Sequence, residues 1–472
     1  MFNIIKYFLP FVFILYSCSN NNKNMASKKD AKKPNIILIL ADDLGYGDLS
    51  CYGQNNFSTP NIDKLANEGI KFTQHYAGST VCSPSRNALM TGLHMGHAVI
   101  RGNGASQNGE GDMPLPANKT TFVEYLQKSG YKTGIFGKWG LGDCGTEGNP
   151  LDHGFDDFFG YTNQILAHNS YPEYLLENCE KVILENEVTY LDKNAWHKGL
   201  GSISTKKVDY SNDLIFDEAL KFIEKNKSQP FFLYFPTTIP HMNDEAEIGQ
   251  RFEIQNSGEF ANKNWSDDEK HYALLIKKLD SYVGRIDEKL NQLNLSKNTL
   301  IIFTSDNGAI NDIDNLSSNG ELRGYKRDLY EGGIRVPFIA KWPEKIHPNS
   351  VSNHISAFWD YFPTILDIAQ VETDSVTDGI SFLPTLINKG KQKEHKYLYW
   401  EFHWWKPSKQ AIRLGKWKGV KNAPNSKIEL YDLNYDISEN NNVAKYYPEI
   451  VYEIDSLFVS SRIPDSRWEL KK

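Results

Sequence analysis

The stretch NIILILADDLGYGD occupies residues 35–48 and decides how the rest of the chain is interpreted. It opens with a short apolar run, NIILIL, of the kind typical of a parallel strand buried on both faces. Two adjacent carboxylates, Asp42 and Asp43, follow the run. Ligands of open α/β sheets bind beyond the carboxyl ends of the strands, so this acidic pair marks a candidate functional site.

Four further apolar runs of strand length recur along the chain, separated by stretches with helical spacing. The runs are TGIF (133–136), PFFLYF (230–235), TLIIFT (299–304) and VPFIA (336–340). The helical stretches lie at 61–69, 122–130, 213–226 and 267–293. This alternation predicts an α/β fold in which helices flank a mostly parallel sheet, and we expect all five runs to be buried parallel strands.

The pattern changes at about residue 373, where strand-like runs follow one another without helical stretches between them. These runs lie at 397–402, 410–421 and 427–433, and a helical stretch at 447–458 closes the series. Successive strands predict antiparallel pairing. We therefore expect a main domain at residues 34–372 and a smaller C-terminal α+β subdomain at 373–472 that carries an antiparallel sheet.

The segment CSPSRNALMTG at residues 82–92 combines a thiol with helix-starting and helix-ending signals. Pro84 suits the first turn of a helix, and Thr91 with Gly92 can end it. Cys82 would then lie at a helix N-terminus, where free N–H groups favour an anion. Taken alone, such a cysteine is more often a small buried apolar residue, so further motifs must decide.

The order Cys-x-Pro-x-Arg followed by Thr-Gly resembles the signature of the type I sulfatases, and the resemblance extends over residues 34–455. It implies an alkaline-phosphatase-like fold. It also implies that Cys82 is converted to formylglycine by a formylglycine-generating enzyme and becomes, as the hydrated aldehyde, the nucleophile. Arg86 matches the signature arginine that holds this residue in place.

A second pair of oxygen-bearing side chains, Asp306 and Asn307, follows the run at 299–304. Carboxylate and amide oxygens suit Ca²⁺ or Mg²⁺. Either motif alone would be a common strand-end turn, but two such motifs at one sheet edge favour a cation site. The resemblance implies one divalent ion, usually calcium, held by Asp42, Asp43, Asp306 and Asn307 and also contacting residue 82.

Three residues match the sulfate-binding positions of the sulfatases: Lys138 in GKWGLG, His241 in TIPHMND and Lys326 in LRGYKRD. The resemblance implies that His241 protonates the leaving alcohol and that Asp306 takes a proton from the nucleophile. Without it, Lys138 could extend to solvent and His241 could cap a loop. The usual family form has a histidine where this chain has Gly140, so one contact to the leaving group is missing.

Several residues are candidates for contacts to the rest of the substrate. His168, in AHNSYP, is our candidate for the space of the missing histidine. His97 and Arg101 follow the signature helix, and His403 precedes the aromatic pair at 404–405 in the C-terminal subdomain. Rings beside cations suit a sulfated sugar, although structural hydrogen bonds and core packing are equal alternatives for these residues.

The composition limits the classes of molecule that the protein can bind. The chain of 472 residues has a formal net charge of −7, so it lacks the basic footprint of a nucleic-acid-binding protein. A sulfated polyanion would have to be held by local cations. The expected substrate is a sulfated oligo- or polysaccharide, from ulvan, carrageenan or glycosaminoglycan. A phosphodiesterase or phosphonate hydrolase of the same superfamily and an inactive glycan-binding lipoprotein are the alternatives.

The N-terminus predicts export. An apolar run from Tyr7 to Tyr16, too short to span a bilayer, ends in LYSC at Cys18. We expect a bacterial lipoprotein signal at residues 1–17, with lipidation of Cys18, rather than an ordinary secretory signal. A polar tether at 18–33 would follow. The protein would be lipid-anchored in the periplasm or on the outer-membrane surface, and the sequence favours neither.

Three cysteines remain without a role: Cys51, Cys144 and Cys179. In an exported protein they could form one disulfide and leave one free thiol, or they could be three buried thiols. Their spacing leaves both arrangements open.

Overall fold

The computed structural model describes residues 1–2, 33–103, 112–191, 201–254, 256, 258–311, 313–403 and 407–472. Residues from Lys33 to Lys472 form one compact unit. The expected signal peptide and Cys18 lie outside the described residues, as do Trp404 and Trp405, so those expectations stay predictions.

Five consecutive parallel strands form the middle of the eleven-stranded sheet that the described residues make. β1 (Asn35–Ala41) pairs in parallel with β9 (Phe231–Pro236) on one side and β10 (Thr299–Ser305) on the other. β3 (Lys132–Lys138) continues the sheet beside β9 and β4 (Asp157–Tyr161) lies beside β3, both again in parallel, which gives the order β10-β1-β9-β3-β4. Every residue of β1, β9 and β10 is buried, as the continuous apolar runs predict.

The run at 336–340 corrects one expectation, because its strand β11 (Arg335–Lys341) pairs antiparallel with β10. A parallel connection needs a crossover that returns the chain to the opposite edge of the sheet. The described residues between these strands contain only short helical turns, among them α6 (Glu331–Ile334). The chain therefore re-enters the sheet at the edge where β10 ended.

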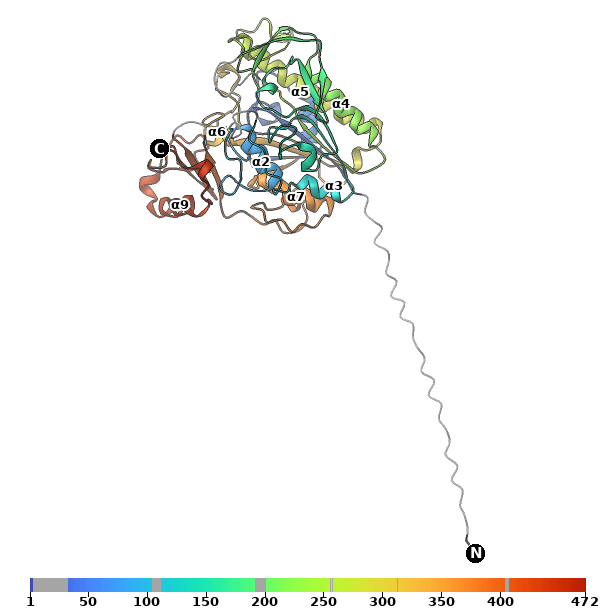
Figure 1. The fold of residues 1–472 in the computed structure, drawn as a ribbon. Coiled ribbons are helices and arrows are strands. Elements are labelled where there is room, and N and C mark those ends of the chain that lie inside the picture. Colours follow the sequence, from blue (N-terminus) through green and yellow to red (C-terminus); the bar gives the residue numbers. More distant parts are fainter. Residues whose placement is uncertain are drawn as a thin grey trace. The chain divides into compact units, whose positions relative to one another are not determined.

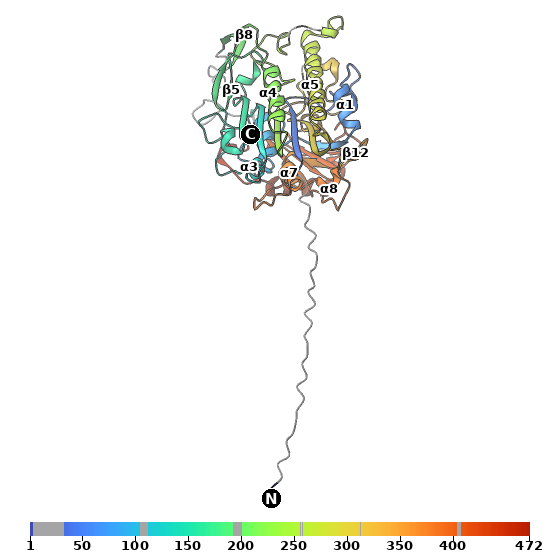
Figure 2. The same ribbon diagram turned by 90° about the vertical axis from the view of Figure 1, so that its right-hand side faces the viewer.

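Further strands complete both sides of the sheet, and Figure 2 shows β12 towards one side and β5 towards the other. They are β2 (Ile70–Tyr76), β12 (Ser350–Ser352) and β13 (Ser356–Ala357) on the β11 side, and β5 (Tyr174–Glu177) and β6 (Glu180–Ile183) on the β4 side. β7 (Glu187–Tyr190) and β8 (Ser202–Lys206) form a separate two-stranded sheet.

Helices cover both faces of the large sheet (Figure 1). One face carries α1 (Pro60–Asn67), α4 (Ser211–Lys225) and α5 (Asp267–Gln292), and the other carries α2 (Cys82–Thr91), α3 (Phe122–Lys128) and α7 (Tyr361–Ala369), followed by the short α8 (Leu383–Leu386). Alternate residues of β1 enter the two cores, Ile37 on the first face and Leu38 on the second. Among the described residues, no helix is both long and apolar enough to cross a bilayer.

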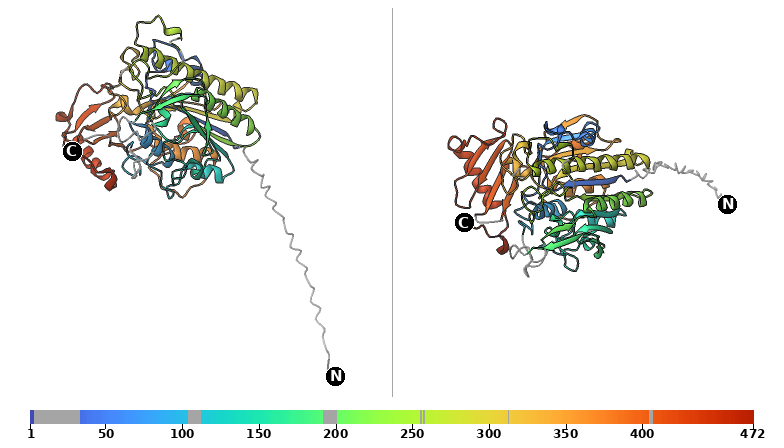
Figure 3. Two further views of the ribbon diagram at one scale, coloured as in Figure 1. Left: turned by 45° about the horizontal axis from the view of Figure 1, so that its top comes forward. Right: turned by 90° about the horizontal axis from the view of Figure 1, so that it is seen from above.

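The C-terminal region forms a second sheet, seen at one side of both views in Figure 3. Its four antiparallel strands are β14 (Leu398–Phe402), β15 (Lys409–Leu414), β16 (Trp417–Lys421) and β17 (Glu429–Asp432), and α9 (Pro448–Ser460) packs on it. The expected antiparallel sheet and closing helix are confirmed. The domain boundary at residue 373 stays a prediction.

One disulfide joins Cys144 to Cys179, and Cys51 and Cys82 are free thiols. Of the two arrangements that the sequence left open, the structure thus contains one disulfide with Cys51 unpaired. The bond links the loop after β3 to the turn between β5 and β6.

Candidate active site

Functional side chains gather where four neighbouring parallel strands of the sheet end. Asp42 follows β1, Lys138 is the last residue of β3, His241 lies beyond β9 and Asp306 follows β10. Asp42 and Asp306 are fully buried, and Lys138 and His241 are 1% and 9% exposed. Neighbouring strand ends thus bring together residues that are more than 260 positions apart in the chain, at the edge where such sheets bind ligands.

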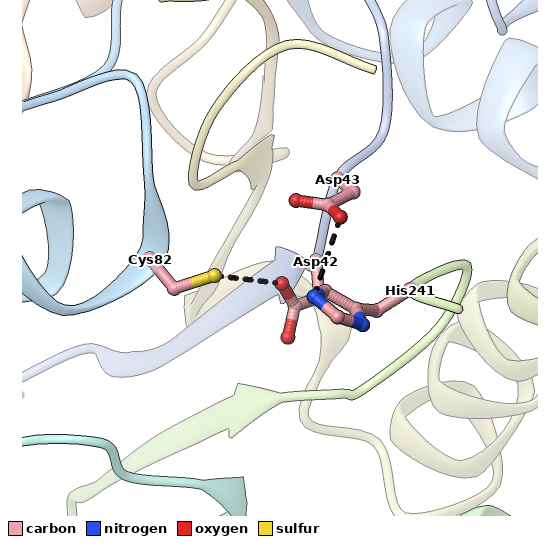
Figure 4. A group of neighbouring side chains, drawn as sticks. All are labelled: Asp42, Asp43, Cys82 and His241. Carbon is pink, nitrogen blue, oxygen red and sulfur yellow. Dashed lines mark hydrogen bonds and ion pairs between the residues drawn. The ribbon is translucent and has the colours of Figure 1, made fainter. Parts of the chain in front are cut away.

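Cys82 reaches this edge from the first residue of α2. Its Sγ lies 3.4 Å from Asp42 Oδ1 (Figure 4) and 3.9 Å from Lys326 Nζ. The helix ends, as the sequence predicts, at Gly92 in the left-handed conformation. Burial and the nearby Asp42 charge raise the pKa of the Cys82 thiol, so an unmodified Cys82 stays protonated and is a poor nucleophile.

Arg86, one helical turn after Cys82, ties α2 to the strand ends. Its Nε and Nη2 donate to Asp306 Oδ2 over 3.2 and 2.9 Å, and its Nη1 donates to the Lys138 carbonyl. Nη2 also lies 3.3 Å from Asp42 Oδ2. A fully buried guanidinium with this many acceptors holds the helix in one position against the sheet.

The two lysines are paired with the two adjacent carboxylates. Lys138 Nζ lies 2.7 Å from Asp42 Oδ2, and Lys326 Nζ lies 2.7 Å from Asp43 Oδ2. Burial opposes the charge of Lys138, but Asp42 together with the other nearby acidic groups outweighs it, so the pKa of Lys138 is raised. The pKa of Lys326 is raised in the same way by Asp43. The site therefore contains two buried ammonium groups.

The acidic groups form a crowded set of oxygen donors. Asp43 adopts a left-handed backbone (φ 65°), which non-glycine residues take mainly at functional sites and turns. Its N–H donates to Asp306 Oδ1 over 3.2 Å. Burial and the charge of Asp42 raise the pKa of Asp306, whereas Lys138 and the other surrounding cations outweigh burial and lower that of Asp42. Closely spaced buried carboxylates are stabilised by a cation.

Asn307 supplies an observation that fits such a cation. Its Nδ2 donates to Asp43 Oδ1 over 2.7 Å and to the Gly308 carbonyl. Its Oδ1 is buried and has no hydrogen-bond partner among the described residues. Ligand atoms of Asp42, Asp43, Cys82 and His241 also lie within 4.8 Å of one another. Carboxylate and amide oxygens of this kind fit a hard divalent ion.

Two histidine rings stack beside the lysines. His241 donates from Nδ1 to the Met242 carbonyl, so its Nε2 is the acceptor that faces Lys326 Nζ at 3.0 Å. Burial and Lys326 lower the pKa of His241 to about 4. The His168 ring lies 5.1 Å away, and Glu245 holds its Nδ1 at 3.1 Å and raises its pKa. His168 thus reaches the edge of the site.

The space beside Gly140 is occupied by a residue that the sequence did not indicate. A Cβ at Gly140 would lie 3.2 Å from Gln164 Cγ, and the Gly140 backbone is left-handed (φ 72°). Gln164 donates to Ser83 Oγ, which in turn donates to the Gly140 carbonyl over 2.7 Å. The only hint in the sequence that another residue fills this space was the glycine at position 140, where the family usually has a histidine.

The other candidates for sugar contacts have partners elsewhere. His97 Nδ1 lies 2.8 Å from Asp378 Oδ1, within a group that also includes His94. Arg101 and His403 both pair with Glu401, over 2.8 and 3.0 Å. The structure therefore groups these residues around Asp378 and Glu401, and their role in substrate binding stays a prediction.

Comparison with known proteins agrees with this geometry. The family model described as sulfatase matches residues 34–371. The chain belongs to the sulfatase family. It is accordingly a sulfuric ester hydrolase. A second model, described as the C-terminal region of N-sulphoglucosamine sulphohydrolase, matches residues 320–459 of the sulfatase.

Among characterised relatives, the sulfatase is 30% identical to the N-acetylgalactosamine-6-O-sulfatase of Bacteroides thetaiotaomicron, covering 96% of this chain and 97% of the relative. It is 31% identical to the N-acetylgalactosamine-6-sulfatase of Mus musculus, covering 93% and 82%. A similar solved structure is a Bacteroides thetaiotaomicron 6S-sulfatase from a study of glycosaminoglycan metabolism, with a TM-score of 0.75, 29% identity and coverage of 91% and 99%. Another is Ps i-CgsB in complex with neocarrahexaose, with a TM-score of 0.72, 27% identity and coverage of 93% and 96%.

Proposed function

We propose that this sulfatase hydrolyses sulfate esters on a sulfated carbohydrate, with residue 82 acting as formylglycine. The observation that carries the proposal is the position of Cys82, which begins α2 within 4 Å of both Asp42 and Lys326. A nucleophile derived from this residue would face two buried lysines, the arrangement that a transferring anionic group requires.

Formylglycine, once hydrated, supplies a hydroxyl nucleophile, and the surrounding residues supply the rest. Arg86 holds the N-terminal turn of α2 against the strand ends. Lys138, Lys326 and His241 bind the sulfate oxygens. Asp306, whose charge acts on residue 82, accepts a proton from the hydroxyl group of the nucleophile. We assign the proton for the leaving alcohol to His241. Its Nε2 lies 3.4 Å from Asp43 Oδ2 and accepts from Lys326 Nζ over 3.0 Å, so Nε2 would first take a proton from the Lys326 ammonium or from solvent and then pass it to the leaving oxygen.

We assign Asp42, Asp43, Asp306 and Asn307, together with residue 82, as the ligands of one divalent cation. Calcium is our first choice and magnesium the second, because all the donors of the protein are oxygens. The lysines now pair with Asp42 and Asp43. A cation beside these carboxylates would free both ammonium groups for the sulfate ester.

The proposed substrate class rests on the substrates named for similar proteins. Those matched over most of their length include sulfatases named for N-acetylgalactosamine 6-sulfate, and a structural neighbour was solved with a carrageenan fragment. We therefore propose a sulfated glycan, from glycosaminoglycan or from an algal polysaccharide such as carrageenan or ulvan. The polar tether and lipid anchor that we propose below would suit an enzyme that acts on polymers in the periplasm or on the outer-membrane surface.

The two alternatives are less favoured. A phosphonate monoester hydrolase shares the fold at 20% identity and a TM-score of 0.61, a likeness that extends to the fold alone. Lys138 and Lys326 match the sulfate-binding positions of the sulfatases, and for that reason sulfate esters are favoured over phosphonate esters. A catalytically inactive glycan-binding lipoprotein would have lost part of the site, yet Cys82, Arg86 and the acidic donors are all present.

Sulfate release from a panel of defined sulfated oligosaccharides tests the proposal, with matched phosphate and phosphonate esters as comparison substrates. The protein is produced together with a formylglycine-generating enzyme, and the mass of the peptide containing residue 82 reports the modification. We expect sulfate release only from protein with modified residue 82. Phosphoester hydrolysis faster than sulfate release, or full activity of protein with unmodified Cys82, would contradict the proposal.

We also propose that residues 1–17 direct export, that Cys18 is lipidated and that residues 18–33 tether the main domain at 34–372 and its C-terminal subdomain at 373–472. The protein would then be anchored in the periplasm or on the outer-membrane surface. Replacing Cys18 by Ala should release the protein from the membrane fraction, and external protease treatment of intact cells distinguishes the two locations.

A further inference from the structure

The two faces of the C-terminal sheet have different partners. Trp400 and Ala411 lie on the face that packs in one apolar cluster with Tyr76 of the large sheet. Their neighbours Tyr399 and Ile412 point to the opposite face and pack under α9. Successive strand residues alternate between faces. The α9 side of the C-terminal sheet is therefore directed away from the main domain, which contains Cys82 and the candidate active site.

A cleft of about 860 Å³ lies on this α9 side. One wall is a single stripe of α9, with Pro448, Val451, Tyr452 and Asp455 at helical spacing. The other walls are the loops at 424–428 and 442–445. The volume lies in the range of small-ligand sites, although this cleft is open to solvent rather than enclosed.

The charges lining this cleft are mainly positive. Lys421 is paired with Asp455 over 2.8 Å. Lys427 and Lys445 line the cleft without a carboxylate partner in the part of the chain that the structure describes, and Lys445 lies over the Tyr446 ring at 4.5 Å. Two unpaired ammonium groups at one cleft stand out on a protein whose net charge is −7. They would attract an anionic ligand.

Exposed aromatic rings lie in and beside the same cleft. Tyr452 lines it and is 79% exposed, and the neighbouring Tyr446 is 65% exposed. An exposed ring offers an apolar face together with a hydroxyl group that can hydrogen-bond. This combination suits a ligand with both apolar and polar surfaces, as a sugar ring has.

We propose that this cleft is a second binding site for a sulfated oligosaccharide, separate from the catalytic centre. Tyr452 would pack on a sugar ring, while Lys427 and Lys445 would bind its sulfate groups. The identity of the glycan rests on the proposed function, whereas binding itself does not require hydrolysis. A polymer held here would raise its effective concentration at the active site, so the cleft would favour polymers over short substrates.

Binding is measured on Cys82→Ala protein, which removes turnover, by affinity electrophoresis in gels containing chondroitin sulfate, ι-carrageenan or unsulfated dextran. We expect retardation by at least one sulfated polymer and none by dextran. Tyr452→Ala and the double variant Lys427→Ala/Lys445→Ala should each weaken this binding about tenfold or more, which corresponds to about 1.4 kcal/mol. Binding that remains at the catalytic centre is the same in all variants.

Matched controls separate this site from general surface charge. Tyr435→Ala removes an exposed tyrosine outside the cleft, and Lys391→Ala/Lys393→Ala removes two exposed lysines elsewhere. Both should bind like the parent. Equal binding by the cleft variants and the parent, or no binding of either sulfated polymer, overturns the proposal. Sulfate release from short sulfated oligosaccharides by the cleft variants with Cys82 intact should be unchanged, and its absence from every protein and every such substrate would instead count against the proposed function.

Discussion

Asn307 donates its side-chain amide to Asp43 over 2.7 Å and keeps its own side-chain oxygen buried without a hydrogen-bond partner among the described residues. An unsatisfied buried acceptor costs about 1–3 kcal/mol, and a bound cation would remove that cost. Calcium should therefore raise the melting temperature of the protein, and a chelator should reverse the rise. In Asn307→Ala, the calcium concentration that gives half of this rise should increase about tenfold or more.

Differential scanning fluorimetry across a calcium titration measures this effect without using activity. Asn422→Ala, which removes an amide directly after β16 in the C-terminal region, is the control and should respond to calcium like the parent. An identical calcium dependence in Asn307→Ala and the parent would remove Asn307 from the ligand set.

Replacing Cys82 by Ala should abolish sulfate release and leave the fold intact, because the side chain is small and the neighbouring hydroxyls of Ser83 and Ser85 are engaged in hydrogen bonds to the Gly140 and Asp306 carbonyls. Cys51→Ser is the control, since Cys51 is the other free thiol among the described residues and lies outside the cluster of side chains around Cys82. Its activity should equal that of the parent. Ion chromatography of released sulfate and circular dichroism give the two readouts, and undiminished release by Cys82→Ala would sink the nucleophile assignment.

The arrangement of Asp42, Lys138, His241 and Asp306 could be predicted from the sequence, because each follows a run that reads as a buried parallel strand. The carboxyl ends of such strands share one edge of the sheet. Lys326 could be placed only through the family resemblance, since it lies in a long segment with no strand pattern. The direction of β11 was predicted wrongly for the same reason, because that segment contains no crossover helix among its described residues.

Contacts between loops could not be predicted from the sequence. Gln164 lies beside Gly140 because the loops that follow β3 and β4 contact each other. The spacing of residues along the chain does not predict this contact. The pairing of Cys144 with Cys179 likewise depends on where β5 and β6 turn. Local periodicity reports the strands and helices, whereas these contacts depend on the tertiary packing of the loops.

Gly140→Ala should destabilise the protein for two separable reasons. The left-handed backbone costs a non-glycine residue about 1–2 kcal/mol, and the new Cβ would press on Gln164 at 3.2 Å. Gly145→Ala isolates the first effect, because Gly145 is also left-handed (φ 84°) but has no atom within 4 Å of the added Cβ. Urea unfolding should show the larger loss at Gly140, and equal losses at both positions would mean that Gln164 moves aside freely.

Removing the disulfide with Cys144→Ser/Cys179→Ser should lower the free energy of unfolding by about 3–4 kcal/mol, since the bond closes a loop across 35 residues. The same loss should appear in the parent after treatment with a reducing agent, and the double variant should be insensitive to that agent. Thermal melting with and without dithiothreitol measures both. A parent protein whose melting temperature ignores reduction would contradict the prediction.

His75 should make the protein less stable in mild acid. Its ring is fully buried on β2 between the Ser356 hydroxyl at 2.8 Å and the Tyr361 hydroxyl at 3.3 Å. Burial, with a smaller effect of His354, lowers its pKa from 6.5 to about 3. Between these two pH values, His75 binds a proton in the unfolded chain but not in the folded protein. The contribution of His75 to the free energy of unfolding is therefore complete above pH 6.5 and is lost as the pH falls towards 3.

The loss attributable to His75 should approach about 1.4 kcal/mol per pH unit within that window. His75→Gln keeps polar atoms at the position but cannot titrate, so its unfolding free energy should fall less steeply with acid than that of the parent. Other buried histidines, such as His94, contribute equally to both proteins and cancel in the difference. Urea titrations at half-unit steps from pH 7 to pH 4 measure the two slopes, and parallel slopes would show that His75 is not the group that responds.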